Sequence, residues 1–173
     1  MQSGADVNTK DEMSWTRLMW AVRNNCNAVV AFLLKTPNID VNLKNDIGGS
    51  ALDLAVRKNN EALKLLLDVP GIDVNVVNNE GKSALHWAVF VNNIEALTLL
   101  LSHPGITALT LNQKDKDYGF TPVAVVKDRL EHLAELVADL RVDLDTTDKE
   151  GRTLEEVARC AFLASDSLAS PML

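Results

Sequence analysis

A fixed internal repeat constrains the fold of this chain more than any other feature of its sequence. The segment SALDLAV at 50–56 returns 33 residues later as SALHWAV at 83–89, and EALKLLL at 61–67 returns as EALTLLL at 95–101. Looser copies extend the pattern to four units, whose segment pairs are 16–22 with 29–34, 50–56 with 61–67, 83–89 with 95–101, and 121–123 with 133–137. A period of this length is typical of a solenoid, in which one supersecondary unit is stacked several times.

A second recurring element connects each unit to the next. Asp-Val-Asn occurs at 6–8, 40–42 and 73–75, with looser forms at 109–112 and 142–145. The turns that follow contain a glycine, which adopts positive φ without a side-chain clash, at Gly48, Gly81, Gly119 and Gly151. The chain is therefore predicted to repeat the order turn, short helix, second helix and extended loop.

Helix pairs of this kind determine the domain organisation, because each pair has an apolar face that it cannot bury alone. Neighbouring pairs must stack, and 173 residues suffice for one domain built in this way. We predict an all-α solenoid of stacked helix-turn-helix units with short hairpin-like turns. Its parts are a partial unit at 1–10, units at about 11–44, 45–77, 78–114 and 115–147, and a carboxyl-terminal cap at 148–164, which together form one domain at 1–164, with a flexible tail at 165–173.

Departures from the repeat predict local differences between the units. The stretch 55–67 is one residue shorter than its counterpart 88–101, so the helix junction of the second unit is expected to be tightened near 59–60. The fourth unit is also short, and the loop before it, 103–115, is long. The amino end, 4–8, reads as the tail of a unit whose helices are missing, which fits either a fragment of a longer array or a natural start with a short cap.

These features resemble the ankyrin repeat, whose signature is a glycine-containing turn followed by Thr-Pro-Leu-His and, two positions later, a small residue. The segment SALHWA at 83–88 matches this signature after Gly81, and Thr121-Pro122 supplies the Thr-Pro pair after Gly119. The resemblance extends from about residue 5 to about residue 164. It implies a curved stack whose concave groove, lined by the turn tips and the exposed side of each first helix, holds another protein.

The charge balance limits the classes of partner. The chain has 17 Lys+Arg against 24 Asp+Glu and a net charge of −7, which disfavours a nucleic-acid binder and favours a neutral or basic protein partner. No apolar run reaches the roughly 18 residues of a membrane span, and the first residues lack a secretory signal, so we expect no membrane insertion and a cytoplasmic or nuclear location. Cys26 and Cys160 are expected to be small core residues.

Candidate catalytic groups are sparse, and we expect neither an enzyme nor a bound cofactor or metal. His86 occupies the signature histidine position, where the resemblance implies structural hydrogen bonds. His103 and His132 have no cysteine partner nearby, so zinc spacing is absent, and the common phosphate-binding and nucleophile motifs are missing. The acidic residues of the turns are expected to form a solvated row, namely Asp11, Glu12, Asp46, Glu80, Asp115, Asp117, Asp148 and Glu150.

The resemblance also implies which side chains contact a partner, because in such arrays these lie on the turn tips and the first helices. The predicted contact residues are Met13, Trp15, Arg23, Ile47, Arg57, Lys58, Lys82, Phe90, Val91, Tyr118 and Phe120. Four aromatic residues are expected to face water and to act as hot spots, each contributing about 2 kcal/mol or more to binding: Trp15, Phe90, Tyr118 and Phe120. The alternative for Trp15 and Phe120 is that they fold against neighbouring turns.

Two functional hypotheses follow from this pattern. The first is a protein-binding module, monomeric and free of cofactors, that acts as a scaffold or an inhibitor. The alternative is a regulatory segment that positions a catalytic or pore domain of a larger enzyme, channel or secreted effector.

A modification site is a separate prediction from the resemblance. An asparaginyl hydroxylase that acts on ankyrin-like domains favours the Asn of Asp-Val-Asn with a leucine eight residues earlier. Asn42 with Leu34 and Asn75 with Leu67 meet this condition. The alternative is that each asparagine bonds its own backbone in the loop.

Overall fold

The computed structural model describes residues 6–122, 124, 143, 145, 147–153 and 156. Within these residues the chain forms helices and no strand, so the predicted all-α class is confirmed. The helices are α1 (Arg17–Arg23), α2 (Asn27–Leu34), α3 (Ala51–Lys58), α4 (Asn60–Leu67), α5 (Ala84–Phe90), α6 (Ile94–Ser102) and α7 (Ala108–Leu111). The predicted fourth helix pair, nearly all of the predicted cap helix and the predicted tail lie outside the described residues.

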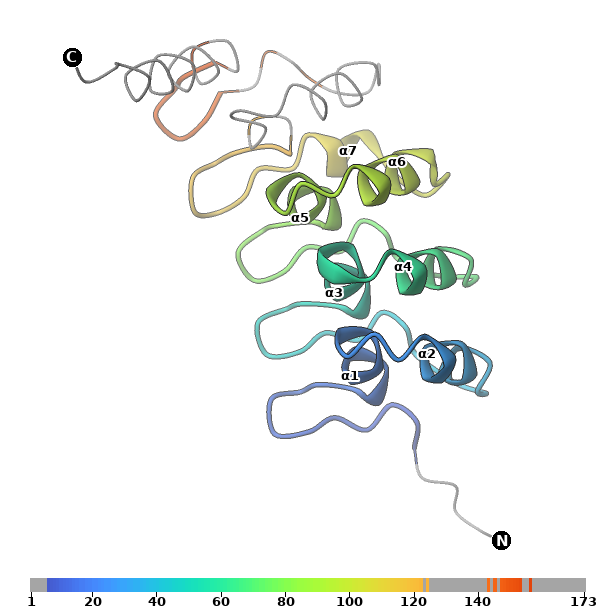
Figure 1. Ribbon diagram of the computed structural model, residues 1–173. Coiled ribbons are helices and arrows are strands. Elements are labelled where there is room, and N and C mark those ends of the chain that lie inside the picture. The colour runs from blue at the N-terminus through green and yellow to red at the C-terminus, as the bar shows by residue number, and fades with distance from the viewer. Residues whose placement is uncertain are drawn as a thin grey trace, which may run out of the picture.

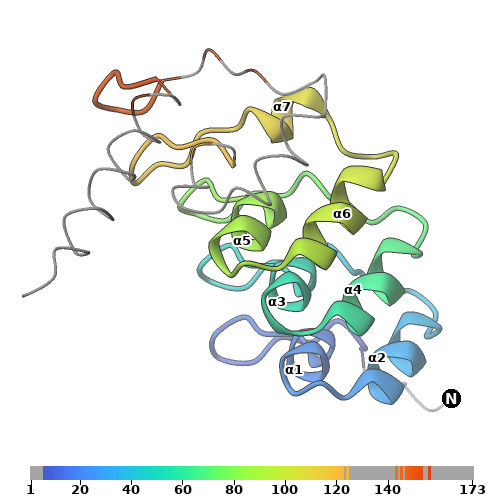
Figure 2. The same cartoon turned by 45° about the horizontal axis from the view of Figure 1, so that its top comes forward.

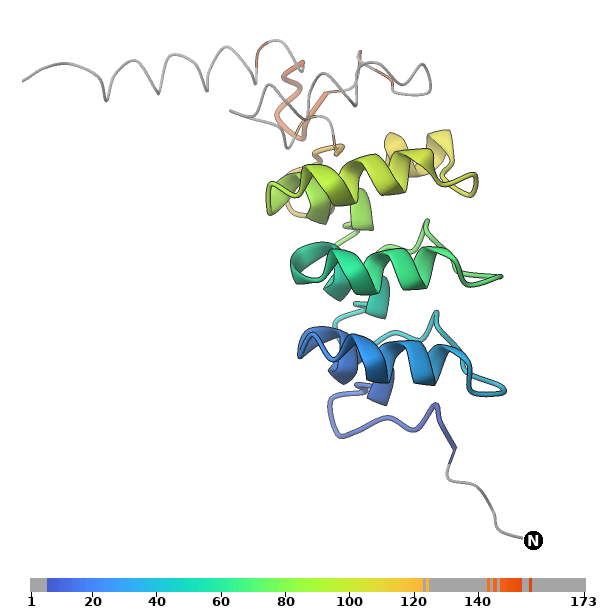
Figure 3. The same ribbon diagram turned by 45° about the vertical axis from the view of Figure 1, so that its right-hand side comes forward.

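The six longer helices stand in two parallel columns. α1, α3 and α5 form the column of first helices and contact one another in that order, while α2, α4 and α6 form the column of second helices (Figures 1 and 3). The turns that precede the first helices project beside that column (Figure 1), and the tilted view in Figure 2 shows the three helix pairs in the same orientation. The described part of the chain is therefore a solenoid of stacked helix pairs, as predicted.

Each first helix begins after a hydroxyl residue, and in α1 and α3 this hydroxyl accepts from a free backbone N–H of the first turn. The Thr16 hydroxyl accepts a hydrogen bond from the Met19 N–H at 3.2 Å, and the Ser50 hydroxyl accepts one from the Asp53 N–H at the same distance. Asp53 returns the bond by accepting from the Ser50 N–H at 2.8 Å, which completes a capping box. The cap residues fix where each first helix starts relative to its turn.

The junction between the two helices of a pair differs in the second unit, as its missing residue predicts. In the first and third units three residues separate the helices, and the middle one adopts positive φ, 55° at Asn25 and 59° at Asn92. In the second unit Asn59 alone separates α3 from α4, ending one helix and capping the next. The deleted position is therefore the one that holds a left-handed asparagine in the other two units.

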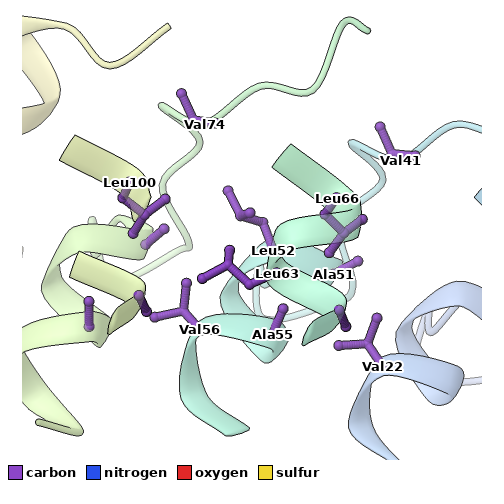
Figure 4. Packing of buried hydrophobic residues seen from close by; sticks show 14 of the residues in the cluster. Val22, Val41, Ala51, Leu52, Ala55, Val56, Leu63, Leu66, Val74 and Leu100 are labelled. Carbon is purple, nitrogen blue, oxygen red and sulfur yellow. The ribbon is translucent and has the colours of Figure 1, made fainter. Parts of the chain in front are cut away.

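The core lies between the two columns and is shared by successive units. Val22, Val56, Leu63, Leu66 and Leu100 are fully or almost fully buried, although they come from four different helices and three different units (Figure 4). Burying one such side chain stabilises the fold by about 1.5 to 3 kcal/mol. Since the same side chains fill the space between neighbouring units, the stack is stabilised by its interfaces as much as by its individual helix pairs.

One helix was not expected from the sequence. α7 lies in the loop predicted to be extended before the fourth unit, and the Thr107 hydroxyl caps it by accepting from the Thr110 N–H at 3.3 Å. The extra length of this loop is therefore taken up by a short helical turn. It buries Leu111 and leaves Leu109 exposed.

Candidate functional site

Each turn before a first helix begins with an aspartate or an asparagine whose side chain holds the turn together. A side-chain oxygen there accepts hydrogen bonds from backbone N–H groups two to four residues later, at Asp11, Asn45, Asn78, Asp115 and Asp148. Asp115 and Asp148 are only 4% and 8% exposed. The expectation of a solvated row of acids is therefore wrong for these two residues, because their carboxylates hold the turns closed.

Further along each turn, one residue adopts a left-handed conformation. Four glycines occupy this position with φ between 72° and 78°, namely Gly48, Gly81, Gly119 and Gly151. In the first turn Ser14 stands there with φ 59°, and its hydroxyl donates to the Asp46 carboxylate at 2.5 Å. The predicted role of the glycines is confirmed.

Successive turn tips are joined by backbone hydrogen bonds. The N–H of Asn79 donates to the Ile47 carbonyl at 3.1 Å, and the N–H of Lys116 donates to the Glu80 carbonyl at 2.7 Å. In the same way, the N–H of Asp46 donates to the Met13 carbonyl, and the N–H of Lys149 donates to the Tyr118 carbonyl. The tips therefore form a continuous row at one edge of the stack, in which each side chain has a fixed place relative to the next.

The asparagines of the connecting loops form a second row of bonds between units. The Asn42 amide nitrogen donates to the Gly71 carbonyl at 2.8 Å, and its oxygen accepts from the Asp73 N–H at 2.9 Å. Asn8 and Asn75 bind the following loop in the same way. The side chains of Asn42 and Asn75 therefore bond the next unit and not their own backbone, and their hydroxylation stays a prediction.

Together the turn tips and the exposed sides of α1, α3 and α5 form what we call the turn-side face. Most of its predicted contact residues reach solvent there. Phe90 is 63% exposed, and more than half of the surface of three residues at the tips is also exposed, namely Met13, Ile47 and Tyr118. Arg23, Arg57 and Lys58 are exposed as well, while Val91 is half-buried.

Three predicted contact residues lie deeper in this face. Phe120 is only 9% exposed, so the expectation that its ring faces water is wrong; it stacks on Tyr118 with ring centroids 5.6 Å apart. Trp15 is half-buried against the core and lies 4.9 Å from the Trp20 ring. Lys82 bridges Glu80 at 2.9 Å and Asp117 at 2.6 Å, so its charge is already partnered.

Sequence reasoning missed other exposed apolar residues, which lie away from the turn-side face. Phe32 is 71% exposed on α2, and Val29 on the same helix is about half exposed. They align with Leu65 and Ala62 of α4, which are half-buried and fully buried. Comparing the second helices position by position could have identified this surface, because later units place the aligned residues in the stack.

Cys26 was expected in the core and is exposed instead. It occupies the N-cap position of α2, where Asn59 and Asn93 cap the later second helices with their side chains, and it makes no side-chain capping bond. The sequence alignment of the three junctions points to this position, which belongs to a helix end and not to the core.

His86 has the structural role that its position implies. Its Nδ1 accepts from the Ser83 backbone N–H at 3.1 Å, so the neutral ring carries its proton on Nε2, which donates to the Phe120 carbonyl at 3.1 Å. Burial is the main cause that lowers the pKa of His86, which favours this neutral form. Nδ1 therefore holds the start of α5, and Nε2 joins the third unit to the turn of the fourth.

Asp53 occupies the position of His86 in the preceding unit, and its burial was not anticipated. The side chain is 4% exposed, and burial raises the pKa of its carboxyl from the ordinary 3.8 to about 6, although hydrogen bonds from Ser50 favour the charged form. No ion pair to Asp53 is present in the described part of the chain, although the positive charges of Lys44 and Arg57 act on it. The second unit thus holds a buried acid at the position where the third unit has a buried histidine.

This acid should make stability depend on pH. Because the folded state binds the Asp53 proton more tightly than the unfolded state, its contribution favours folding below pH 4 and is lost as pH rises from about 4 to 6. Asn in place of Asp53 keeps the acceptor oxygen and cannot ionise. We expect Asp53→Asn to gain on the order of 2 kcal/mol relative to wild type between pH 4 and pH 7. Denaturant unfolding of both proteins at several pH values measures this difference, and a constant difference would contradict it.

Among the described residues, no group of three or more His, Cys, Asp or Glu side chains is placed to hold a metal ion. The helices of that same part of the chain are all too short or too polar to cross a bilayer.

Helix pairs that recur on one template, with each turn bonded to the next, define a solenoid of helix-turn-helix repeats. A family model described as ankyrin repeats matches the chain in three copies, at residues 1–78, 18–115 and 52–148. The chain belongs to the ankyrin repeat family, whose members generally mediate protein-protein interaction and are typically non-catalytic. A search of curated proteins returned no match.

Proposed function

We propose that this protein binds a segment of another protein through its turn-side face and acts as a scaffold or an inhibitor of that partner. The observation that supports this most strongly is the exposure of Phe90, Met13, Ile47 and Tyr118 on a single face. Large apolar side chains that the stack leaves in water are typical of interaction surfaces. Aromatic residues in particular dominate the binding energy of such surfaces.

The way the face is held supports the same proposal. Backbone bonds join each turn tip to the next, and the first helices beneath them are fixed by core contacts. A surface that is ordered before binding loses little conformational entropy when a partner docks, so more of the contact energy appears as affinity. The turn-side face is thus suited to recognition without rearrangement.

The histidine of the signature supports a binding role over catalysis. Both nitrogens of His86 are engaged in hydrogen bonds inside the stack, and its ring is almost fully buried. A general acid or base needs a nitrogen that can reach a substrate. We therefore propose no reaction for this chain.

Peptides selected from a displayed random library on the folded protein can be used to test the proposal. Two exposed phenylalanines, one on the turn-side face and one away from it, provide a test variant and its matched control. Phe90 lies on the turn-side face and Phe32 on a second helix. We expect Phe90→Ala to lower the affinity for the recovered peptides by about tenfold or more. Phe32→Ala should change their affinity by less than about threefold.

The outcome that would contradict the proposed function is equally specific. If the recovered peptides lose affinity for Phe32→Ala and bind Phe90→Ala as well as wild type, the turn-side face is not the binding surface. Circular dichroism of both variants controls for loss of the fold. Titrations by fluorescence anisotropy supply the dissociation constants.

A further inference from the structure

We propose that the occupant of the turn-side face is an acidic segment of a partner protein that carries one large apolar side chain. Its carboxylates would pair with Arg23, Arg57 and Lys58, and its apolar side chain would pack on Trp87 and Phe90. This inference rests on the proposed function and specifies the chemistry of the partner.

The first observation is the register of three side chains. Arg23, Arg57 and Phe90 each stand seven residues after the cap residue of their helix, so they occupy the same position on α1, α3 and α5. Packed helices lie about 8 to 10 Å apart, which sets the spacing of these side chains along the stack. The face therefore presents two cations and then an aromatic ring in one line.

The second observation is that these cations pair with aromatic rings and not with carboxylates. The Arg57 guanidinium lies 4.6 Å from the centroid of the Trp87 ring, and that of Arg23 lies 5.2 Å from Trp15 and 5.5 Å from Trp20. No described carboxylate forms an ion pair with either arginine or with Lys58. A guanidinium held over a ring keeps its N–H groups available for a carboxylate of a partner.

The third observation is that three cations of the turn-side face stand apart from its acids, in a separate band. On this face the exposed acids stand at the turn tips, together with Lys116 and Lys149. By contrast, Arg23, Arg57 and Lys58 stand at the far ends of the first helices, about 10 Å away at 1.5 Å per residue. Between the bands, Lys82 already partners two of the tip acids, Glu80 and Asp117. An acidic segment that crosses the helix ends therefore meets the bases before the acids.

The distance between the basic helix ends and the acidic turn tips also favours a short acidic peptide over a nucleic acid as the partner. The net charge of −7 predicts a neutral or basic partner when the charges are treated as one sum, but the helix ends of the first two units are locally basic. A polyanion long enough to gain from phosphate contacts would extend over the acidic tips, which repel it. A short peptide with a few carboxylates fits within the basic band.

The apolar half of the surface begins one unit further along the stack. The ring of Phe90 meets that of Trp87 edge to face at 5.8 Å, and Val91 follows Phe90 at the helix end. Since Trp87 also lies beneath the Arg57 guanidinium, the basic and apolar halves share one side chain. We therefore expect the carboxylates of the partner over α1 and α3, and its apolar side chain over α5.

The peptides recovered from the library test this chemistry through their composition. We expect clusters of Asp and Glu next to a large apolar residue. Arg57→Glu should then lower the affinity for these peptides by about tenfold or more, because it places a negative charge against their carboxylates. Lys35→Glu, at an exposed residue at the end of α2, makes the same change in net charge and should alter affinity by less than about threefold.

Each other outcome has a defined meaning. A neutral or basic consensus whose binding still depends on Phe90 would overturn the acidic occupant and leave the proposed function standing. Binding that does not depend on Phe90 would overturn both. A single-stranded oligonucleotide that binds more tightly than the peptides, with loss on Arg57→Glu, would replace the acidic segment with a nucleic acid.

Discussion

Replacing Gly48 with alanine is expected to lower the free energy of unfolding by about 2 to 4 kcal/mol, because the added methyl group has no space and the backbone angle is unfavourable. A Cβ atom at Gly48 would lie 2.5 Å from Asn79 Oδ1 and 2.6 Å from the Asn79 backbone nitrogen, and the residue has φ 75°. The Asn79 N–H also forms the bond to the preceding turn tip. Chemical denaturation of the variant and the wild type measures the loss.

Gly71 provides the matched control for this substitution. It has φ 84°, but a Cβ atom built there meets no atom within 4 Å. Gly71→Ala should therefore cost only the left-handed backbone preference, about 1 to 2 kcal/mol. Equal losses for the two variants would show that the turn of the second unit does not depend on its close contact with the next turn.

Removing the side chain of Asn59 is expected to lower the free energy of unfolding by about 2 to 3 kcal/mol, the sum of a lost helix cap and a lost buried hydrogen bond to the preceding unit. The Asn59 oxygen accepts from the Ala62 N–H at 3.0 Å, and its amide nitrogen donates to the Val22 carbonyl at 3.3 Å. One buried side chain thus caps α4 and joins it to the preceding unit. Denaturant unfolding of Asn59→Ala measures the effect.

The control for Asn59 is its neighbour across the unit boundary. The Asn59 amide also donates to Asn27 Oδ1 at 2.8 Å, and this bond is only partly buried. Asn27→Ala removes that bond and leaves those to Ala62 and Val22 in place, so it should cost less than about 1 kcal/mol. If Asn27→Ala were as damaging as Asn59→Ala, the capping role of Asn59 would be incorrect.

The repeating elements of the fold could be predicted because they are encoded by residues close in sequence. Apolar spacing determines the helices, Thr16, Ser50 and Ser83 mark where first helices begin, and one missing residue predicts the single-residue junction at Asn59. Such local signals act through capping and backbone preference, which depend on a few neighbouring residues. The stack then follows from the need to bury the shared apolar face.

The features that were missed depend on residues from another unit. The ring of Phe120 stacks on Tyr118, and the Phe120 carbonyl accepts a hydrogen bond from Nε2 of His86, 34 residues earlier, which holds this residue against the third unit. Cys26 stands where later units place a capping asparagine that bonds the unit before it. A pattern within one unit does not contain this information. Aligning the units could have identified the position of Cys26, whereas the burial of Phe120 is shown only by three-dimensional contacts.

The sequence predicted where the candidate site lies more completely than it predicted how the side chains of the site are arranged. Met13, Ile47, Phe90 and Tyr118 are exposed on the turn-side face as the family resemblance implies. The sequence predicts Arg23 and Arg57 as contact residues of one groove, and the structure adds that they stand in line with Phe90 and lie over tryptophan rings. That arrangement depends on the register between units, which net charge and composition do not describe.

The exposed apolar side chains of the turn-side face, Met13, Ile47 and Phe90, are proposed to contribute much to binding and little to the stability of the stack. Titration of a recovered peptide into the triple variant Met13→Ala, Ile47→Ala, Phe90→Ala tests this claim most directly, with unfolding measured on the same sample. We predict that the free energy of unfolding changes by less than about 1.5 kcal/mol, while the affinity for the peptide falls by about a hundredfold or more. A variant that unfolds readily, or one that stays folded and still binds as tightly as wild type, would contradict the claim.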